Sequence, residues 1–245
     1  MNEPKILICT CCNTEDRRNQ MDDFLETHER YASLFDGIDS VIEVRQTDKT
    51  VKPTWEKPLM LLDHMDEGYD YLMWIDDDAG FIRFDVDFRT YFPKDGKLFY
   101  FTQEREWFEG VGKCGRFSAK DIYLNAGVFF VKCCEESKKI LKEWYSKRRV
   151  RYVDNLNDQP VIIRWYLDHK DICGLADSKI FNAFMPDYDN GPVKLANAKT
   201  KDTIVLHLAA HSRKHRDEYF GAKAKNTEVK KEVEKHTKFV EDWED

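Results

Sequence analysis

YDYLMWIDDD, residues 69–78, is a short apolar run that ends abruptly in three carboxylates. A run of this length, rich in aromatic and β-forming residues and bounded by charge, is typical of a buried strand in a mostly parallel sheet. Ligands of open α/β sheets bind beyond the carboxyl ends of the strands, where Asp76, Asp77 and Asp78 would lie. Because adjacent carboxylates repel one another, the cluster favours a hard cation such as Mg²⁺ or Mn²⁺. A solvated acidic turn could have the same short sequence.

Strands and helices alternate on both sides of this stretch. This alternation predicts parallel βαβ units, with helices on both faces of one sheet. The polar run 12–20 is expected to be a loop, and the glycine-containing segment 104–118 is expected to be a loop with a functional role. Further strands are expected at residues 5–10, 41–45, 98–102, 122–132 and 203–209, and helices at 17–34, 55–65, 135–149 and 158–169.

Length and composition predict one main domain. The 245 residues are 42% hydrophobic, and no linker or internal repeat divides them. We expect a domain over residues 1–221 and an amphipathic helix over 222–245 that packs on it. The net charge of −7 argues against a nucleic-acid partner, since phosphate binding requires a basic face.

The cysteines indicate a reducing compartment. The chain has seven, an odd number, and four of them form two adjacent pairs, which fits free thiols better than a disulfide framework. Cys9 and Cys12 have a Cys-x-x-Cys spacing, but no second such pair completes a zinc site. Neither a leader sequence nor an apolar run of about 18 residues is apparent. The expectation is a soluble cytoplasmic protein without a membrane anchor.

Four blocks of sequence together resemble a known family. They are KILICTCC (5–12), WEKPLMLLDHM with YDYLMWIDDDAGFI (55–82), YLNAGVFFVK (123–132), and NDQPVI with HLAAHSRKH (157–215). In this order they resemble nucleotide-sugar glycosyltransferases of the GT-A type, most closely the retaining galactosyl-, xylosyl- and mannosyltransferases of glycosyltransferase family 34. The resemblance implies a Rossmann-like α/β domain that moves a sugar from a UDP-sugar, with Mn²⁺ or Mg²⁺, to a glycan or glycoprotein with retention.

The resemblance also implies a metal site and a base site. Asp76 and Asp78 match the outer members of the family's Asp-x-Asp motif, and Asp76 would also reach the ribose. His207 matches the late metal-ligand histidine, although a strand-end histidine held by ordinary hydrogen bonds would look the same. Cys9 and Thr10 would lie beside the nucleotide base, which main-chain groups would contact.

Five further residues acquire expected roles from the same resemblance. Lys57 would approach the ribose or diphosphate, although a surface lysine on a helix is an alternative. Arg213 would hold the diphosphate. Asp158 and Gln159 would face the donor sugar, with Asp158 alternatively a simple helix N-cap. Asn125 would hydrogen-bond the sugar or the acceptor.

The chain also departs from the family. Family members carry an N-terminal membrane anchor and work in the Golgi lumen, and they have Gly-Cys where this chain has Ala209-Ala210. A short enzyme without an anchor resembles the glycosyltransferases that large algal viruses encode for their own capsid proteins. Two other functions stay open: a metal-dependent nucleotidyltransferase and a non-catalytic sugar-binding module. The segment CTCCNTEDRR (9–18) lacks the glycines with which nucleotidyltransferases cradle phosphates, which disfavours the first.

Overall fold

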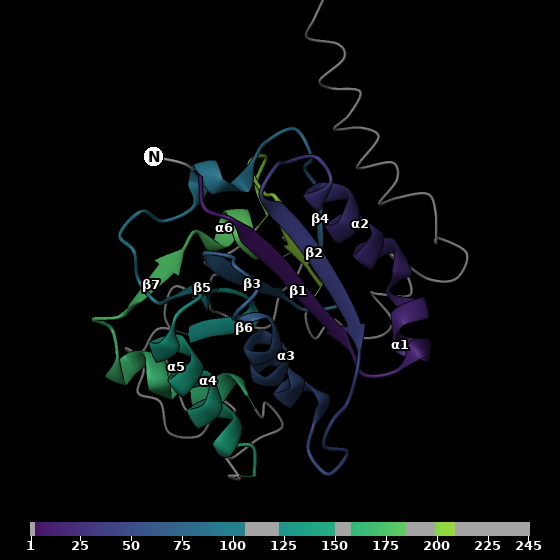
Figure 1. Cartoon of the computed structure of the whole chain (residues 1–245). Coiled ribbons are helices and arrows are strands. Elements are labelled where there is room, and N and C mark those ends of the chain that lie inside the picture. Colours follow the sequence, from purple (N-terminus) through teal and green to yellow (C-terminus); the bar gives the residue numbers. More distant parts are fainter. Residues whose placement is uncertain (1–2, 106–122, 150–157, 185–198, 209–245) are drawn as a thin grey trace, which may run out of the picture.

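The computed structural model describes residues 3–105, 123–149, 158–184 and 199–208. Its centre is a six-stranded sheet with helices on both faces (Figure 1). The strands are β1 (Ile6–Cys12), β2 (Ile38–Val44), β3 (Tyr71–Ile75), β4 (Ala79–Phe81), β5 (Phe99–Arg105), β6 (Tyr123–Lys132), β7 (Cys173–Ala176) and β8 (Val205–His207). The helices are α1 (Glu15–Gln20), α2 (Asp22–Ala32), α3 (Glu56–His64), α4 (Glu135–Ser146), α5 (Gln159–Asp168) and α6 (Ser178–Phe181), with 3₁₀ turns η1 (Pro53–Trp55) and η2 (Phe88–Tyr91).

The sheet is mostly parallel, as the sequence predicts. Its strand order is β2-β1-β3-β6-β5-β7, and β4 and β8 form a separate two-stranded sheet. Only β6 is antiparallel to its neighbours in the large sheet, β3 and β5. The carboxyl ends of β1, β2, β3 and β5 therefore meet the beginning of β6 at one edge, the edge where ligands bind in sheets of this kind.

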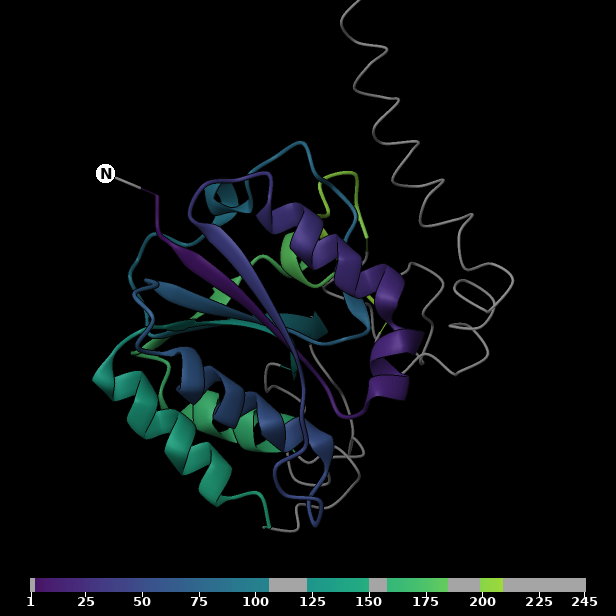
Figure 2. The same cartoon turned by 45° about the vertical axis from the view of Figure 1, so that its right-hand side comes forward.

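The two faces of the sheet bury different side chains of the same strands. In β1, Leu7 and Cys9 pack with residues of α3, α4 and α5, whereas Ile6 and Ile8 pack with residues of α2, β4, β8 and η2. This alternation is the period of two that an extended strand imposes. Figure 2 shows α3, α4 and α5 together on one side of the sheet and α2 on the other.

The segment after β1 differs from the sequence prediction. A loop was expected over residues 12–20 and one helix over 17–34, but α1 occupies part of the loop and the chain turns at Met21 before α2. The side chain of Thr14 accepts a hydrogen bond from the Arg17 backbone N–H (3.1 Å), and acidic residues fill the first turn. Both features favour a helix start. The prediction of a loop over residues 12–20 was wrong because the Thr14 cap and the acidic first turn start a helix within it.

Two sequence expectations about the whole chain can be compared with the described part. The six described cysteines are all free thiols, which agrees with the expected absence of a disulfide framework there. Within the described ranges, no helix has both the length and the apolar character needed to cross a bilayer. The expected C-terminal helix, residues 222–245, lies outside the described residues.

A buried histidine ties the end of β1 to the start of β4. His28 Nε2 lies 2.8 Å from the Ala79 carbonyl, so this nitrogen carries the hydrogen. The hydroxyl of Thr10 then donates to Nδ1 over 3.0 Å. Burial lowers the pKa of His28 to about 4, and the bond to Ala79 opposes this shift only in part. His28 is therefore neutral in the folded protein at pH 7.

This neutral histidine predicts a pH dependence of stability. As the pH falls from 6.5 towards 4, the unfolded chain protonates His28 while the folded chain does not, so the free energy of unfolding falls. The loss approaches about 3 kcal/mol at pH 4. In His28→Gln the side chain cannot titrate, so the stability difference between wild type and variant should shrink over this window in urea unfolding. A difference that stays constant from pH 7 to pH 4 would contradict the assignment.

Candidate functional site

The sheet topology brings the acidic motif and the beginning of β6 together. β3 ends at Ile75, which pairs with Val128 of the antiparallel β6. The backbone N–H of Asp76 then donates to the Gly127 carbonyl over 2.8 Å, which fixes the chain as it leaves the strand. The three aspartates consequently project at the ligand-binding edge of the sheet, as the sequence predicts.

The small sheet delivers His207 to the same place. β8 runs antiparallel to β4, so His207 lies opposite Ala79, the residue directly after the acidic motif. Backbone hydrogen bonds on both sides fix this register: His207 N–H donates to the Ala183 carbonyl (2.8 Å), and Leu208 N–H donates to the Asp78 carbonyl (2.9 Å). A residue 129 positions later in sequence therefore comes within hydrogen-bonding distance of Asp78.

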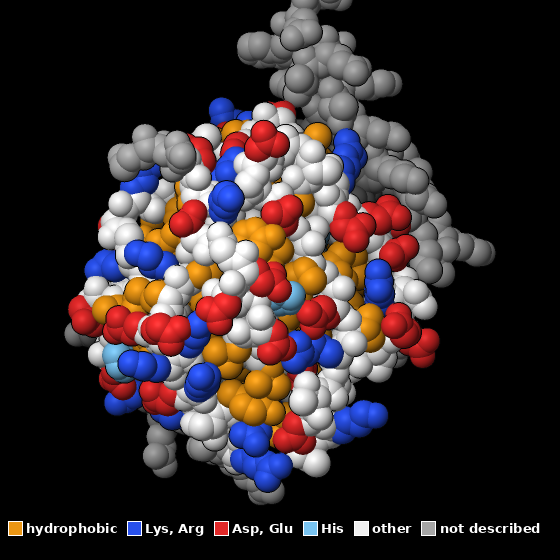
Figure 3. Space-filling view, viewed as in Figure 1, with side chains coloured by type: hydrophobic (Ala, Val, Ile, Leu, Met, Phe, Trp, Pro, Cys, Tyr) orange, Lys and Arg blue, Asp and Glu red, His pale blue; other side chains and the backbone are white. Residues whose placement is uncertain are grey.

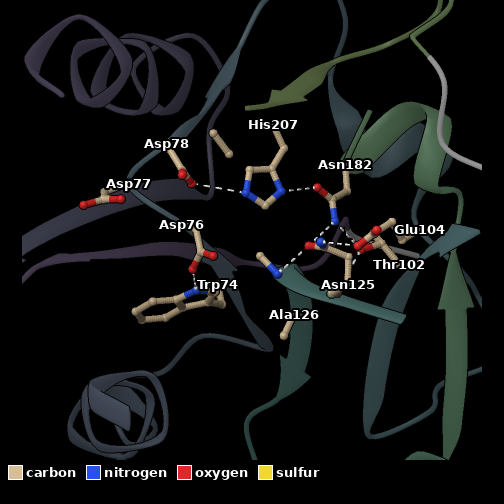
Figure 4. A network of polar contacts seen from close by, with 12 residues as sticks. Trp74, Asp76, Asp77, Asp78, Thr102, Glu104, Asn125, Ala126, Asn182 and His207 are labelled. Atoms are coloured by element: carbon tan, nitrogen blue, oxygen red, sulfur yellow. Dashed lines mark hydrogen bonds and ion pairs between the residues drawn. The ribbon is translucent and has the colours of Figure 1, made fainter. Parts of the chain in front are cut away.

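Asp76, Asp78 and His207 form a group that suits a divalent cation. One ligand atom from each lies within 4.8 Å of the others, and His207 Nε2 is 3.1 Å from Asp78 Oδ1 (Figure 4). His207 is buried, whereas both aspartates are partly exposed, which leaves an approach for substrate. Two carboxylate oxygens and an imidazole nitrogen are a donor set that Mn²⁺ accepts. The predicted ligand residues are thus brought together, and their ligand role stays a proposal.

The middle aspartate takes a different role. Asp77 points away from the group (Figure 4), and Arg17 of α1 binds it through Nε and a terminal nitrogen, each over 2.6 Å. The same guanidinium is 3.9 Å from Asp78 Oδ2. Arg17 therefore offsets part of the charge of the motif. Sequence reasoning missed Arg17, because the only local signal was a basic residue in a run expected to be a loop.

Lys57 lies between the acidic motif and the start of α5. Its Nζ is 3.1 Å from Asp76 Oδ1, 2.9 Å from Asp158 Oδ2 and 2.9 Å from the Ala126 carbonyl. Only 5% of Lys57 is exposed, so the alternative of a surface lysine is wrong. Burial works against the ammonium, but Asp158 and Asp76 outweigh it and raise the pKa of Lys57. Its predicted contact with a ribose or diphosphate stays a prediction.

Asp76 is affected by burial and by three charged neighbours. Burial raises the pKa of this carboxyl, with Lys57 and His207 opposing the shift and Asp78 adding to it. The indole N–H of Trp74 also donates to Asp76 Oδ1 over 2.7 Å. The raised pKa follows from burial, which Lys57 and His207 offset only in part. Independently of this shift, two carboxylate oxygens and one imidazole nitrogen within 4.8 Å of one another are a donor set that fits a divalent metal ion.

Asp158 and Gln159 begin α5 on the same side of the site. Asp158 is at the N-cap position, but its side chain makes no capping hydrogen bond and pairs with Lys57 instead. Asp158 is therefore not a simple helix N-cap. Gln159 Oε1 accepts a hydrogen bond from the Ala126 N–H over 3.4 Å, so both residues border the beginning of β6.

A chain of buried polar side chains lies behind His207. Asn182 contacts His207 and Asn125, and Asn125 in turn contacts Glu104 at the end of β5 (Figure 4). Thr102 accepts a further bond from Asn182 over 2.7 Å. The predicted residue Asn125 is thus part of a network whose other members the sequence analysis did not identify. Nothing in their local sequence marks them, because the contacts join residues 21 to 80 positions apart.

The remaining predicted residues lie deeper in the protein or outside the described part. Cys9 and Thr10 are fully buried; the thiol contacts the Leu7 carbonyl and the hydroxyl contacts His28. Their predicted place beside a nucleotide base stays a prediction. Arg213 lies outside the described residues.

The surface around the sheet carries mixed charge. Figure 3 shows acidic and basic side chains interspersed over one face, with hydrophobic side chains between them. On this face the described residues form no continuous basic surface of the kind that nucleic-acid binding requires.

The structure is similar to solved structures of glycosyltransferases. A glycosyltransferase involved in the glycosylation of the major capsid of PBCV-1 has a TM-score of 0.66 and 17% sequence identity, covering 88% of this chain and 98% of that one. The galactosyltransferase LgtC, with donor and acceptor sugar analogs, has a TM-score of 0.56 and 14% identity, covering 94% and 95%. The sequence matches no protein-family model and no curated protein. This chain has the GT-A glycosyltransferase fold.

The GT-A fold accounts for nearly the whole length of the chains compared. An active-site mutant of LgtC gives the same result, with a TM-score of 0.54 and 15% identity over 91% of this chain and 94% of that one. The predicted fold class, a GT-A type α/β domain with a mostly parallel central sheet, is confirmed. At such identities the likeness concerns the fold, so the chemistry must be argued from the side chains of this chain.

The position of the His207 ring requires glycine at position 127 of β6. A Cβ atom there would lie 2.0 Å from His207 Cε1 and 2.8 Å from Asn125 Oδ1. We expect Gly127→Ala to displace the imidazole and to weaken Mn²⁺ binding about tenfold or more, measured by calorimetric titration.

A matched control is Gly174→Ala on β7, where the added Cβ would lie 2.7 Å from a ring carbon of Tyr100. This variant introduces crowding away from the cation group, so it should lower the melting temperature and leave Mn²⁺ affinity unchanged. Wild-type Mn²⁺ affinity in Gly127→Ala would show that the position of His207 does not matter for the cation.

Proposed function

We propose that this protein is a metal-dependent glycosyltransferase that moves a sugar from a UDP-sugar to a glycan or glycoprotein acceptor with retention of configuration. One observation carries the proposal: Asp76, Asp78 and His207 converge at the ligand-binding edge of a GT-A sheet. Lys57 pairs with both Asp76 and Asp158. Asp158 thereby places one more carboxylate next to the cation group, where the donor sugar would lie.

Sugar transfer from a nucleoside diphosphate breaks the bond between C1 and the phosphate oxygen. The electron pair stays on the diphosphate, positive charge develops on the sugar, and an acceptor hydroxyl completes the transfer by bonding to C1 and releasing its proton. Asp76, Asp78 and His207 would hold a divalent cation, which, when bound, stabilises the charge of the leaving diphosphate. Lys57 holds Asp76 and Asp158 in fixed positions, so that the two sides of the reaction are oriented before substrate arrives.

Asp158 has the chemistry to stabilise the developing positive charge on the sugar. Its Oδ2 atom is ion-paired with Lys57 over 2.9 Å. Pairing makes a carboxylate a weaker nucleophile, but it keeps the group oriented. Electrostatic support of the sugar is therefore the role we assign to Asp158, with Gln159 and Asn125 as hydrogen-bonding neighbours on the same side.

The choice of acceptor to test is based on the descriptions of the similar structures. One is described as acting in capsid glycosylation, and the other is a galactosyltransferase with donor and acceptor sugar analogs. A viral capsid glycan is accordingly one acceptor to test. A sugar-binding module would share the sugar contacts but would have no need of a cation group aligned with Lys57 and Asp158.

Donor hydrolysis tests the proposal without knowledge of the acceptor. With Mn²⁺ present, the protein should slowly hydrolyse at least one UDP-sugar of a tested panel and release UDP. EDTA should abolish the release. Asp158→Asn should lower this rate by a factor on the order of 10² while leaving UDP affinity nearly unchanged, because the amide carries no charge for the sugar.

Asp87→Asn is the matched control for this variant. Asp87 likewise stands at an N-cap position and is ion-paired, bound to Arg89 over 2.6 Å. Unlike Asp158, it caps its helix, and Arg89 contacts the chain before β1, at the opposite edge of the sheet. This control should keep the wild-type rate.

Near-normal turnover in Asp158→Asn would show that Asp158 takes no part in the reaction. If the wild-type protein released UDP from none of the donors, the proposed function would be contradicted.

A further inference from the structure

The two ring nitrogens of His207 have different partners. One faces the carboxylates, and the other contacts an amide side chain. His207 Nδ1 lies 2.7 Å from Asn182 Oδ1, on the side away from Asp78 (Figure 4). His207 and Asn182 are both buried, at 1% and 0% exposure, so water does not compete freely for these contacts. The ring is therefore held between one amide and one carboxylate.

A backbone group shows which atoms donate and which accept in the network of hydrogen bonds behind His207. The N–H of Gly127 can only donate, and it lies 2.8 Å from Asn125 Oδ1. This contact identifies the oxygen of the Asn125 amide. The other end of the same amide, Nδ2, then donates to the carboxylate of Glu104 over 3.0 Å, which agrees with the assignment.

The assignment passes from Asn125 to Asn182. Asn182 has one amide atom 3.0 Å from Asn125 Oδ1, an acceptor, so that atom must be the nitrogen. The same nitrogen donates to the Thr102 hydroxyl over 2.7 Å. The oxygen of Asn182 consequently faces His207, and since an amide oxygen only accepts, Nδ1 of His207 carries a hydrogen.

The tautomer of His207 follows from this polarity. With the hydrogen on Nδ1, the neutral ring keeps its lone pair on Nε2, the nitrogen 3.1 Å from Asp78 Oδ1. An imidazole nitrogen binds a cation only through its lone pair. Whenever the ring is neutral, the nitrogen that faces the carboxylates is therefore the one with the lone pair that a cation requires, and a bound cation would separate it from Asp78 Oδ1.

We propose that Asn182 is a positioning residue that fixes His207 in the Nδ1–H form and orients its ring towards Asp76 and Asp78. Through Asn125 it also connects the cation group to the part of β6 that borders the proposed sugar site. The cation role rests on the proposed function, whereas the tautomer is a property of the metal-free protein. The two can therefore fail separately.

Nitrogen NMR of the metal-free protein tests the tautomer directly. At a pH where His207 is neutral, its Nδ1 should show the shift of a protonated ring nitrogen and its Nε2 that of an unprotonated one. The His207→Gln variant identifies the signals, since the chain has seven histidines. A neutral His207 protonated at Nε2 would overturn the proposal, whatever the outcome of metal or donor assays.

Variants test the positioning role through Mn²⁺ affinity. Asn182→Leu keeps a similar side-chain size, leaves little room for a replacing water and removes the acceptor at Nδ1. It should weaken Mn²⁺ binding by about 10- to 100-fold. Ser137→Ala is the control: it removes a buried hydroxyl on α4 that contacts Cys134 Sγ and lies outside the network behind His207, so it should lower the melting temperature and leave Mn²⁺ affinity within about twofold of wild type.

Wild-type affinity in a folded Asn182→Leu protein would overturn the positioning role. If this variant does not fold, the tautomer measurement on wild type decides. A wild-type protein that fails to bind Mn²⁺ but shows the Nδ1–H tautomer would contradict the proposed function and leave the assignment of the hydrogen-bond chain in place.

Discussion

Negative charge concentrated at one edge of the sheet is the constraint on which the rest of the site depends. Strand β3 cannot end in three carboxylates without compensation nearby. Arg17 compensates Asp77, and the buried Lys57 is shared between Asp76 and Asp158. Asp78 faces the imidazole of His207, with Arg17 3.9 Å away. The ligand atoms of Asp76, Asp78 and His207 converge between these partners, where a divalent cation would add further positive charge.

The reversed direction of β6 makes this arrangement possible. A parallel strand would bring its carboxyl end to the edge, but β6 brings its beginning, with Asn125 and Gly127. The glycine leaves the space that His207 occupies, and the asparagine links that histidine to the interior of the domain. The cation group and the proposed sugar side of the site are consequently parts of one packed unit, which favours preorganised geometry.

Local signals in the sequence predicted the strand and its acidic end, but they could not predict the residues that surround the acidic motif. The apolar run before Asp76 predicted β3 and its acidic end, because strand composition and charge are local properties. His207 was identified only through the resemblance to a family, since nothing adjacent in sequence marks it as a partner of Asp78. The burial of Lys57, and the roles of Arg17 and Asn182, depend on strand pairing between distant residues. No periodicity within one segment reports such pairing.

In the function we propose, the acidic motif and His207 act as one cation site that binds together with a nucleoside diphosphate. The most direct test is the melting temperature of the protein with UDP, measured in Mn²⁺ and in EDTA, for wild type and Asp78→Asn. A ligand that binds the folded state stabilises it in proportion to its affinity. We expect a large UDP-dependent rise for wild type in Mn²⁺, and little rise in EDTA or in the variant. Equal stabilisation by UDP under all of these conditions would contradict the proposed cation site.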